Sequence, residues 1–158
     1  INAGKVKLLS IENSLFYRNT KLRGHINFTY MNILSAENYP TTGQRIKSIP
    51  QFTANAVISK SILTLQDISL WVMAKLTYYS AQTMAVSAFR DGVPFSDPEY
   101  ELRASFLPDI SMELRWKMIS AKFQCKNIFN SRYYRGTMYN IDVPTQGRNI
   151  STTIEIEL

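Results

Sequence analysis

The chain has 158 residues, a formal net charge of +6 and a single cysteine, Cys125. This length allows one domain. The lone cysteine excludes an internal disulfide and a cysteine-based zinc site. The basic residues are scattered singly rather than gathered in the stripe that a nucleic-acid surface needs. No apolar run reaches the ~18 residues of a membrane helix. A membrane β-barrel stays open, because its outward apolar residues are diluted by inward polar ones.

Seven segments of the chain alternate apolar and polar residues with the period of a β-strand. In chain order they are residues 5–17, 22–34, 52–62, 68–80, 110–117, 119–126 and 149–158. Each segment has one apolar face and one polar face, which is typical of antiparallel sheets that separate two different environments. The pattern therefore predicts an all-β chain.

The connections between these segments alternate between short and long. Residues 18–21, 63–67 and 117–118 are short, whereas 35–50, 81–107 and 131–148 are long and polar. Outer-membrane barrels segregate their connections in this way, with short periplasmic turns and longer extracellular loops. We therefore predict an antiparallel up-and-down transmembrane β-barrel segment of about seven strands, with short turns on one side and long loops on the other. Since such barrels usually have an even strand number, we expect further strands upstream.

Near the end of the chain, the segment CKNIFNSRYY breaks the alternation into two asparagines, a phenylalanine and a tyrosine pair. It resembles a segment near the end of TonB-dependent outer-membrane receptors, where a strand ends in an Asn-(Leu/Ile)-Phe-(Asp/Asn) junction followed by a basic residue and a tyrosine. The stretches SIEN, SIPQ and GRNI resemble the same family in the same order. The matching residues are Ile11, Glu12, Ile49, Pro50, Asn127, Ile128, Phe129, Asn130, Arg132, Tyr133, Gly147 and Arg148.

This resemblance covers nearly all 158 residues and implies the C-terminal part of a plugged receptor barrel of roughly 22 strands. The plug domain and the upstream strands are expected outside this sequence. The resemblance also implies a bacterial outer membrane location, contact with its lipid and coupling to the TonB system. The expected function is uptake of a scarce small molecule of the siderophore, cobalamin or saccharide class. Leu158 is aliphatic where the family usually ends in an aromatic residue.

The polar faces of the predicted strands carry charged residues and the sole histidine, which we expect to line the lumen. These residues are Arg23, His25, Lys75, Glu113, Arg115, Lys122, Lys126, Glu155 and Glu157. Opposite charges on neighbouring strands are expected to pair across the sheet, while Phe123 and Cys125 are expected to face lipid. Lys60 stands on an otherwise apolar face, so we expect it near the membrane interface, where its side chain can reach water.

Two further groups of residues are candidates for a local role. Asn127 and Asn130 are expected to bond backbone groups that become free where a strand ends. In the long loops, aromatic and basic side chains are the candidate ligand contacts, namely Phe89, Arg90, Tyr133, Arg135 and Tyr139.

The sequence offers no chemistry for an enzyme. It shows no nucleophile–base pair, phosphate loop or cofactor fingerprint, and His25 lacks partner ligands for a metal. The acidic residues of 89–101 lack the spacing of a calcium loop. We expect no catalysis, cofactor or nucleic-acid partner. Two alternatives stay open: a soluble β-barrel or sandwich that binds a ligand with its apolar faces inward, and a barrel remnant that does not transport.

Overall fold

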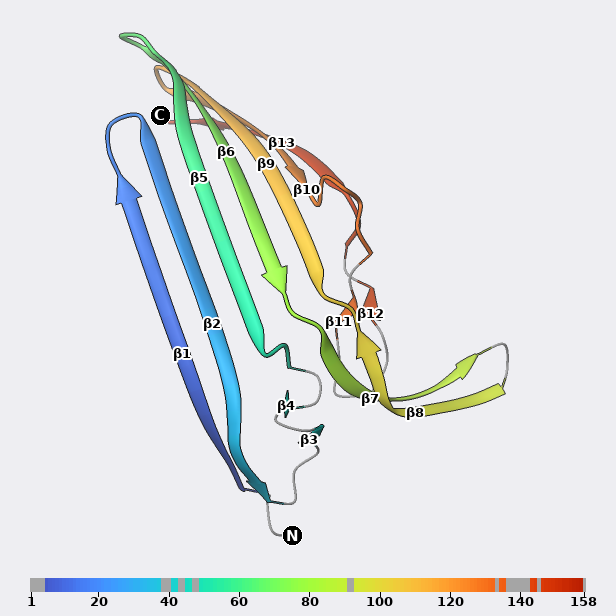
Figure 1. The fold of residues 1–158 in the computed structure, drawn as a ribbon. Helices are drawn as coiled ribbons and strands as arrows, with labels where there is room; N and C mark the ends of the chain where they lie inside the picture. Colours follow the sequence, from blue (N-terminus) through green and yellow to red (C-terminus); the bar gives the residue numbers. More distant parts are fainter. Residues whose placement is uncertain are drawn as a thin grey trace.

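The computed structural model describes residues 5–37, 41–42, 45–46, 49–90, 93–132, 134–135, 143–144 and 146–157. Seven long strands form one antiparallel sheet, in which each strand pairs with the next long strand of the chain (Figure 1). In sheet order they are β1 (Lys5–Arg18), β2 (Leu22–Glu37), β5 (Phe52–Thr64), β6 (Ile68–Tyr79), β9 (Ser105–Trp116), β10 (Ile119–Lys126) and β13 (Asn149–Ile156). The prediction of an all-β, up-and-down sheet of seven strands is confirmed.

Three small hairpins lie apart from this sheet, at the end opposite the short turns (Figure 1). They are β3 (Thr41–Thr42) with β4 (Arg45–Ile46), β7 (Gln82–Arg90) with β8 (Val93–Leu102), and β11 (Tyr134–Arg135) with β12 (Val143–Pro144). The description of residues 81–107 as a loop is therefore wrong in its local structure. This segment holds the β7–β8 hairpin and the first residues of β9.

The short turns are fixed by local hydrogen bonds and by one left-handed residue. Between β1 and β2, the side-chain Oδ1 of Asn19 accepts hydrogen bonds from the backbone N–H groups of Lys21 and Leu22, at 2.9 and 2.7 Å. Between β9 and β10, Lys117 has a φ of 51°, the left-handed conformation that closes a two-residue hairpin. These turns set the register of the long strands.

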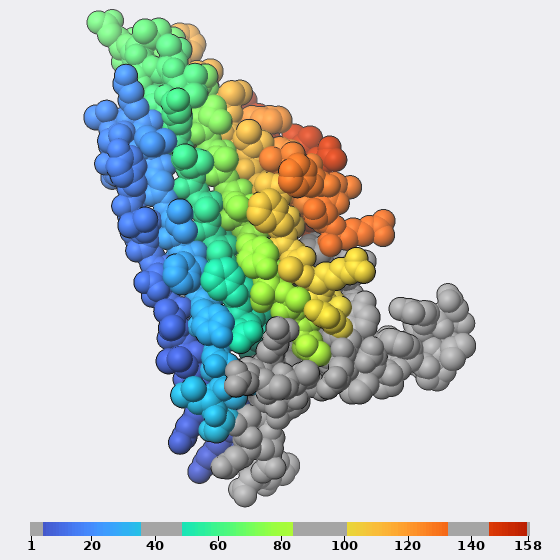
Figure 2. Space-filling view, viewed as in Figure 1, coloured from blue at the N-terminus to red at the C-terminus, as the bar shows by residue number. Residues whose placement is uncertain are grey.

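The register gives the sheet one apolar face and one polar face, because residues paired across strands share a face. One apolar row joins Ile26, Ala56, Leu76 and Pro108, and the next row along the strands joins Asn27, Asn55, Thr77 and Leu107. Among the described residues, only Ile33 and Leu102 are buried hydrophobic side chains. The long strands form a single-layered sheet (Figure 1), and Figure 2 shows the side chains of its strands side by side on one face. The apolar side chains of the described residues do not form an ordinary core.

The sheet is curved, and the polar face is more crowded than the apolar one. In Figure 1, β10 and β13 turn away behind β9. Thr77 and Ser111 on the polar face are 9% and 4% exposed, whereas Ile58 and Ile110 on the apolar face are 53% and 42% exposed. Side chains crowd together on the concave side of a curved sheet, so we call the polar face the inner face and the apolar face the outer face. In the part of the chain that the structure describes, no helix is long and apolar enough to span a membrane.

Candidate functional site

The strand register brings most of the predicted lumen residues to the inner face. It places eight of them there: Arg23, His25, Lys75, Glu113, Arg115, Lys122, Lys126 and Glu155. Glu157 follows the end of β13, where its backbone N–H donates a hydrogen bond to the carbonyl of Met118 at 2.8 Å. That this face lines a lumen stays a prediction.

Four charged residues gather on the inner face of β9, β10 and β13, near the short-turn end. Glu113 stands opposite Lys122 in the register, but the ion pair runs along β9, between Arg115 and Glu113. Among the described residues, no ion pair within contact distance joins two neighbouring strands. The Oγ of Ser120 donates to Oε2 of Glu155 at 3.5 Å. These exposed contacts contribute little to stability and leave a charged inner surface.

Two of the residues predicted to line the lumen, Arg23 and His25, contact aromatic side chains on the inner face. The guanidinium of Arg23 lies 4.4 Å from the ring centroid of Trp71, a cation–π contact worth ~0.5–1 kcal/mol at an exposed site. The rings of Phe16 and His25 are stacked, with centroids 4.1 Å apart. The sequence analysis did not select Trp71 or Phe16, although the alternation puts both on polar faces. No cluster of potential metal ligands occurs within the described ranges.

Three of the five candidate ligand contacts lie in the small hairpins at the loop end of the sheet. Phe89 and Arg90 are the last residues of β7, paired with Pro94 and Val93 of β8. Arg135 lies in β11. Tyr133 and Tyr139 lie outside the described residues. Contact of any of these residues with a ligand stays a prediction.

Asn127, the residue after β10, is the centre of a hydrogen-bond network at the junction. It has a φ of 50° and is 6% exposed. Its backbone N–H donates to Oδ1 of Asp109 in β9 at 2.8 Å, and its Nδ2 donates to the carbonyls of Ser131 and Gln146 at 2.9 and 3.5 Å. Its Oδ1 accepts from the N–H of Ser131 at 2.9 Å. Asn127 thus ties three segments: its backbone N–H holds β9, and its side chain joins the segment after β10 to the approach to β13.

Asn130 continues this network toward the last strand. It also has a left-handed backbone, with a φ of 52°, and its N–H donates to the carbonyl of Asn127 at 2.8 Å. Its Oδ1 accepts from the N–H of Arg148 at 2.9 Å. The expected bonds from side-chain amides to free backbone groups are present in the structure. The junction and the Gly147–Arg148 pair, 17 residues or more apart in the chain, form one structural unit.

Gly147 is required by the close approach of Asn130. A Cβ added at Gly147 would lie 2.8 Å from Oδ1 of Asn130, too close for an ordinary contact. We expect Gly147→Ala to displace the Asn130 side chain, to break its bond to Arg148, and to lower the free energy of unfolding by about 1 kcal/mol. Urea unfolding in detergent micelles measures this. Gly24→Ala is the control, because a Cβ there meets its nearest atoms at 3.9 Å. Equal losses in both variants would contradict the prediction.

Solved structures of similar fold include two proteins of the bacterial genera Neisseria and Pseudomonas. One is the FrpB iron transporter from Neisseria meningitidis (F3-3 variant), with a TM-score of 0.70 and 16% sequence identity over 99% of this chain. The other is a mutant of the ferric enterobactin receptor PfeA from Pseudomonas aeruginosa, with a TM-score of 0.60 and 20% identity over 92% of this chain. No family model and no curated protein matches the sequence.

These similarities cover only part of the two solved proteins. The chain spans 24% of the first and 21% of the second. At such low identity the likeness describes the fold, and here it extends over almost the whole chain. The seven-stranded sheet corresponds to a sector of a much larger barrel.

Proposed function

We propose that this chain, which has the fold of part of a TonB-dependent receptor barrel, is the C-terminal part of an outer-membrane receptor that takes up a scarce ligand with energy coupled through TonB. The observation that carries the proposal is the division of the sheet into an exposed apolar outer face and a polar, charged inner face. A barrel wall in a membrane needs this arrangement.

The structure at the loop end of the sheet favours a ligand-binding receptor over a barrel that only spans the membrane. The hairpin of β7 and β8 runs on for 21 residues beyond the long strands that flank it, and the three small hairpins share this end of the sheet. In barrels of this kind, the end opposite the short turns faces the outside of the cell. We assign ligand capture to this end, with Phe89, Arg90, Tyr133, Arg135 and Tyr139 as candidate contacts.

An iron chelate of the siderophore class is the favoured ligand. The two solved proteins of similar fold are an iron transporter and a ferric enterobactin receptor, which supports this class ahead of cobalamin or a saccharide. The charged inner surface is the side that would meet a plug domain, and the two free edges of the sheet would pair with the remaining strands.

The test is uptake of a labelled ferric siderophore by iron-limited cells that carry the protein. We expect replacement of residues 82–102 by a short Gly-Ser linker to leave the protein in the outer membrane and to lower uptake by at least about tenfold, a loss of about 1.4 kcal/mol or more in binding. The same linker inserted at Asp67, in a turn at the opposite end, is the control. Unchanged uptake in the first variant would contradict the assignment of ligand capture to this end.

The soluble alternative conflicts with the exposure of large apolar side chains on the outer face, such as Leu15 at 69% and Ile154 at 67%. It predicts a protein that folds as a stable monomer without detergent, so fractionation separates the two readings. The remnant alternative has the same strands. Sequencing the coding DNA upstream of Ile1 tests it, because a receptor requires a plug domain and further strands in frame.

A further inference from the structure

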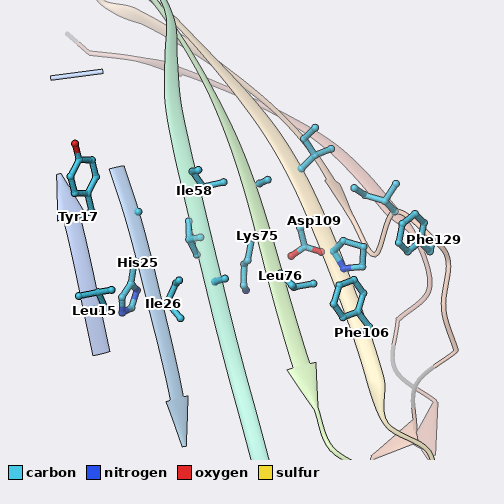
Figure 3. A pocket seen from close by; sticks show the side chains of 17 residues that line it. Leu15, Tyr17, His25, Ile26, Ile58, Lys75, Leu76, Phe106, Asp109 and Phe129 are labelled. Atoms are coloured by element: carbon cyan, nitrogen blue, oxygen red, sulfur yellow. The ribbon is translucent and has the colours of Figure 1, made fainter. Parts of the chain in front are cut away.

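The outer face contains an apolar hollow of about 480 Å³ that crosses β1, β2, β5, β6 and β9 (Figure 3). Its floor lies where Gly24, Ala56 and Ala74 leave space, and the bulkier Tyr17, Ile58, Phe106 and Phe129 border it. His25, Lys75 and Asp109 also border it, but the alternation assigns their side chains to the inner face. The hollow therefore presents almost only hydrocarbon and aromatic surface.

An apolar hollow of this size suits a hydrocarbon chain. Five adjacent strands spaced ~4.8 Å apart span roughly 19 Å, enough for most of one acyl chain. Water gains no polar partners in such a site. On a face that meets membrane hydrocarbon, the chemistry of the hollow points to the tail of a lipid.

Two lysines stand beside the hollow at the short-turn end. Lys60 is on the outer face of β5, two residues beyond Ile58, and its register partner is Leu22, the first residue of β2. Lys60 is therefore level with the β1–β2 turn. The N–H of Ser61 donates to the carbonyl of Lys21 at 2.8 Å, which brings that turn lysine next to β5. Within the described part of the chain, neither lysine takes part in an ion pair.

The position of these lysines fits the head group of the same lipid. Tyr17, which borders the hollow, accepts a hydrogen bond at its hydroxyl from Nδ2 of Asn19 at 2.9 Å, the arrangement of an aromatic ring at a membrane–water interface. Short turns lie on the periplasmic side of such barrels, so the site opens toward the inner leaflet, which is made of glycerophospholipids. Phosphate is the anionic group that these lipids offer to free ammonium groups.

We propose that the outer face binds one anionic glycerophospholipid of the inner leaflet, with its phosphate at Lys60, next to the turn that holds Lys21, and one acyl chain in the hollow. This rests on the proposed function, since it requires the outer face to lie in the membrane. The site combines charge recognition at the interface with a shaped apolar surface about 7 Å further along β5.

The experiment titrates the protein that carries this chain, purified from outer membranes in detergent, with phosphatidylglycerol and counts bound lipid by native mass spectrometry. We expect Lys60→Gln to weaken binding about fivefold, the factor for about 1 kcal/mol per basic residue. Lys117→Gln, in another turn at the same end, is its control. We expect Ala56→Phe to fill the hollow and to weaken binding at least about fourfold, the factor for one buried methylene.

Ala121→Phe is the matched control for the hollow, because Ala121 lies on the outer face of β10 and does not border the hollow. Equal lipid binding by Ala56→Phe and Ala121→Phe would overturn the proposed site and leave the receptor function intact. A loss with Lys60→Gln alone would also overturn it, because the lipid would then be held by its head group only. A protein that stays soluble without detergent and retains no lipid would overturn the proposed function as well.

Discussion

Replacement of Asn127 by alanine is expected to lower the free energy of unfolding by about 3 kcal/mol. The Asn127 side chain makes hydrogen bonds to the backbone of Ser131 in both directions and to the carbonyl of Gln146. Alanine removes all of them and is also less favourable than asparagine at a φ of 50°. Because the site is almost fully buried, water does not replace the lost partners. Urea unfolding in phospholipid vesicles, followed by tryptophan fluorescence, measures the loss.

Asn127→Asp tests the donor half of this network, the hydrogen bonds given by Nδ2 of Asn127. The carboxylate keeps an acceptor for the N–H of Ser131 but has no donor for the carbonyls of Ser131 and Gln146. We expect a loss at least as large as that of alanine, because a carboxylate in this buried site loses its hydration and faces two carbonyl oxygens. If alanine costs less than about 1 kcal/mol, the Asn127 side chain does not hold the segment after β10 to the approach of β13.

An arginine at Phe123 is expected to cost about 2–4 kcal/mol, whereas an arginine at Gln124 is expected to cost less than about 1 kcal/mol. The two residues are neighbours in β10, and the register puts Phe123 on the outer face with Met112 and Gln124 on the inner face with Ser111. A guanidinium on the lipid side loses its hydration, while one on the inner side stays solvated. Unfolding titrations in vesicles measure both variants.

This pair also tests which face meets the membrane. Phe123 and Gln124 are adjacent in β10 and therefore lie at nearly the same depth, so the difference between their costs reports which face meets the lipid. Equal costs at Phe123 and Gln124 would contradict the membrane assignment, and a larger cost at Gln124 would favour the soluble alternative with the apolar face inward.

The seven long strands were predictable because alternation is imposed by the two environments of the sheet. The six connections between these strands were also predictable as short or long. The short ones do no more than reverse the chain, so they are seen as brief interruptions of the alternation. The start of β9 lies before the alternation that begins at Ile110, and it contains Pro108, a residue that is unusual within a strand. The structure tolerates it because the pairing of β9 with β10 ends at Ile110 and Cys125, so Pro108 has only one strand neighbour, and its carbonyl accepts from the N–H of Ile128.

The β7–β8 hairpin was not predictable from local signals. Pro94 and Pro98 argue against a strand, and the hairpin pairs only with itself. Alternation also identified the inner residues but not their neighbours across the sheet. The contact of Arg23 with Trp71 spans β2 and β6, with β5 between them, and depends on a register that only the folded sheet provides. The link between Asn130 and Arg148 is equally nonlocal.

The order of the strands in the sheet follows the order of the chain without any crossover. Each long strand therefore needs only the preceding long strand as its pairing partner. The sheet can form by adding one strand at a time at one edge, and the small hairpins take no part in this pairing. The distance in sequence between paired strands sets the rate of each addition, since longer loops close more slowly. The addition of β10 to β9 is then fast, while that of β9 to β6 must wait for 25 intervening residues. The same order makes the wall modular, because the loss of one hairpin would leave its two flanking strands antiparallel and able to pair with each other.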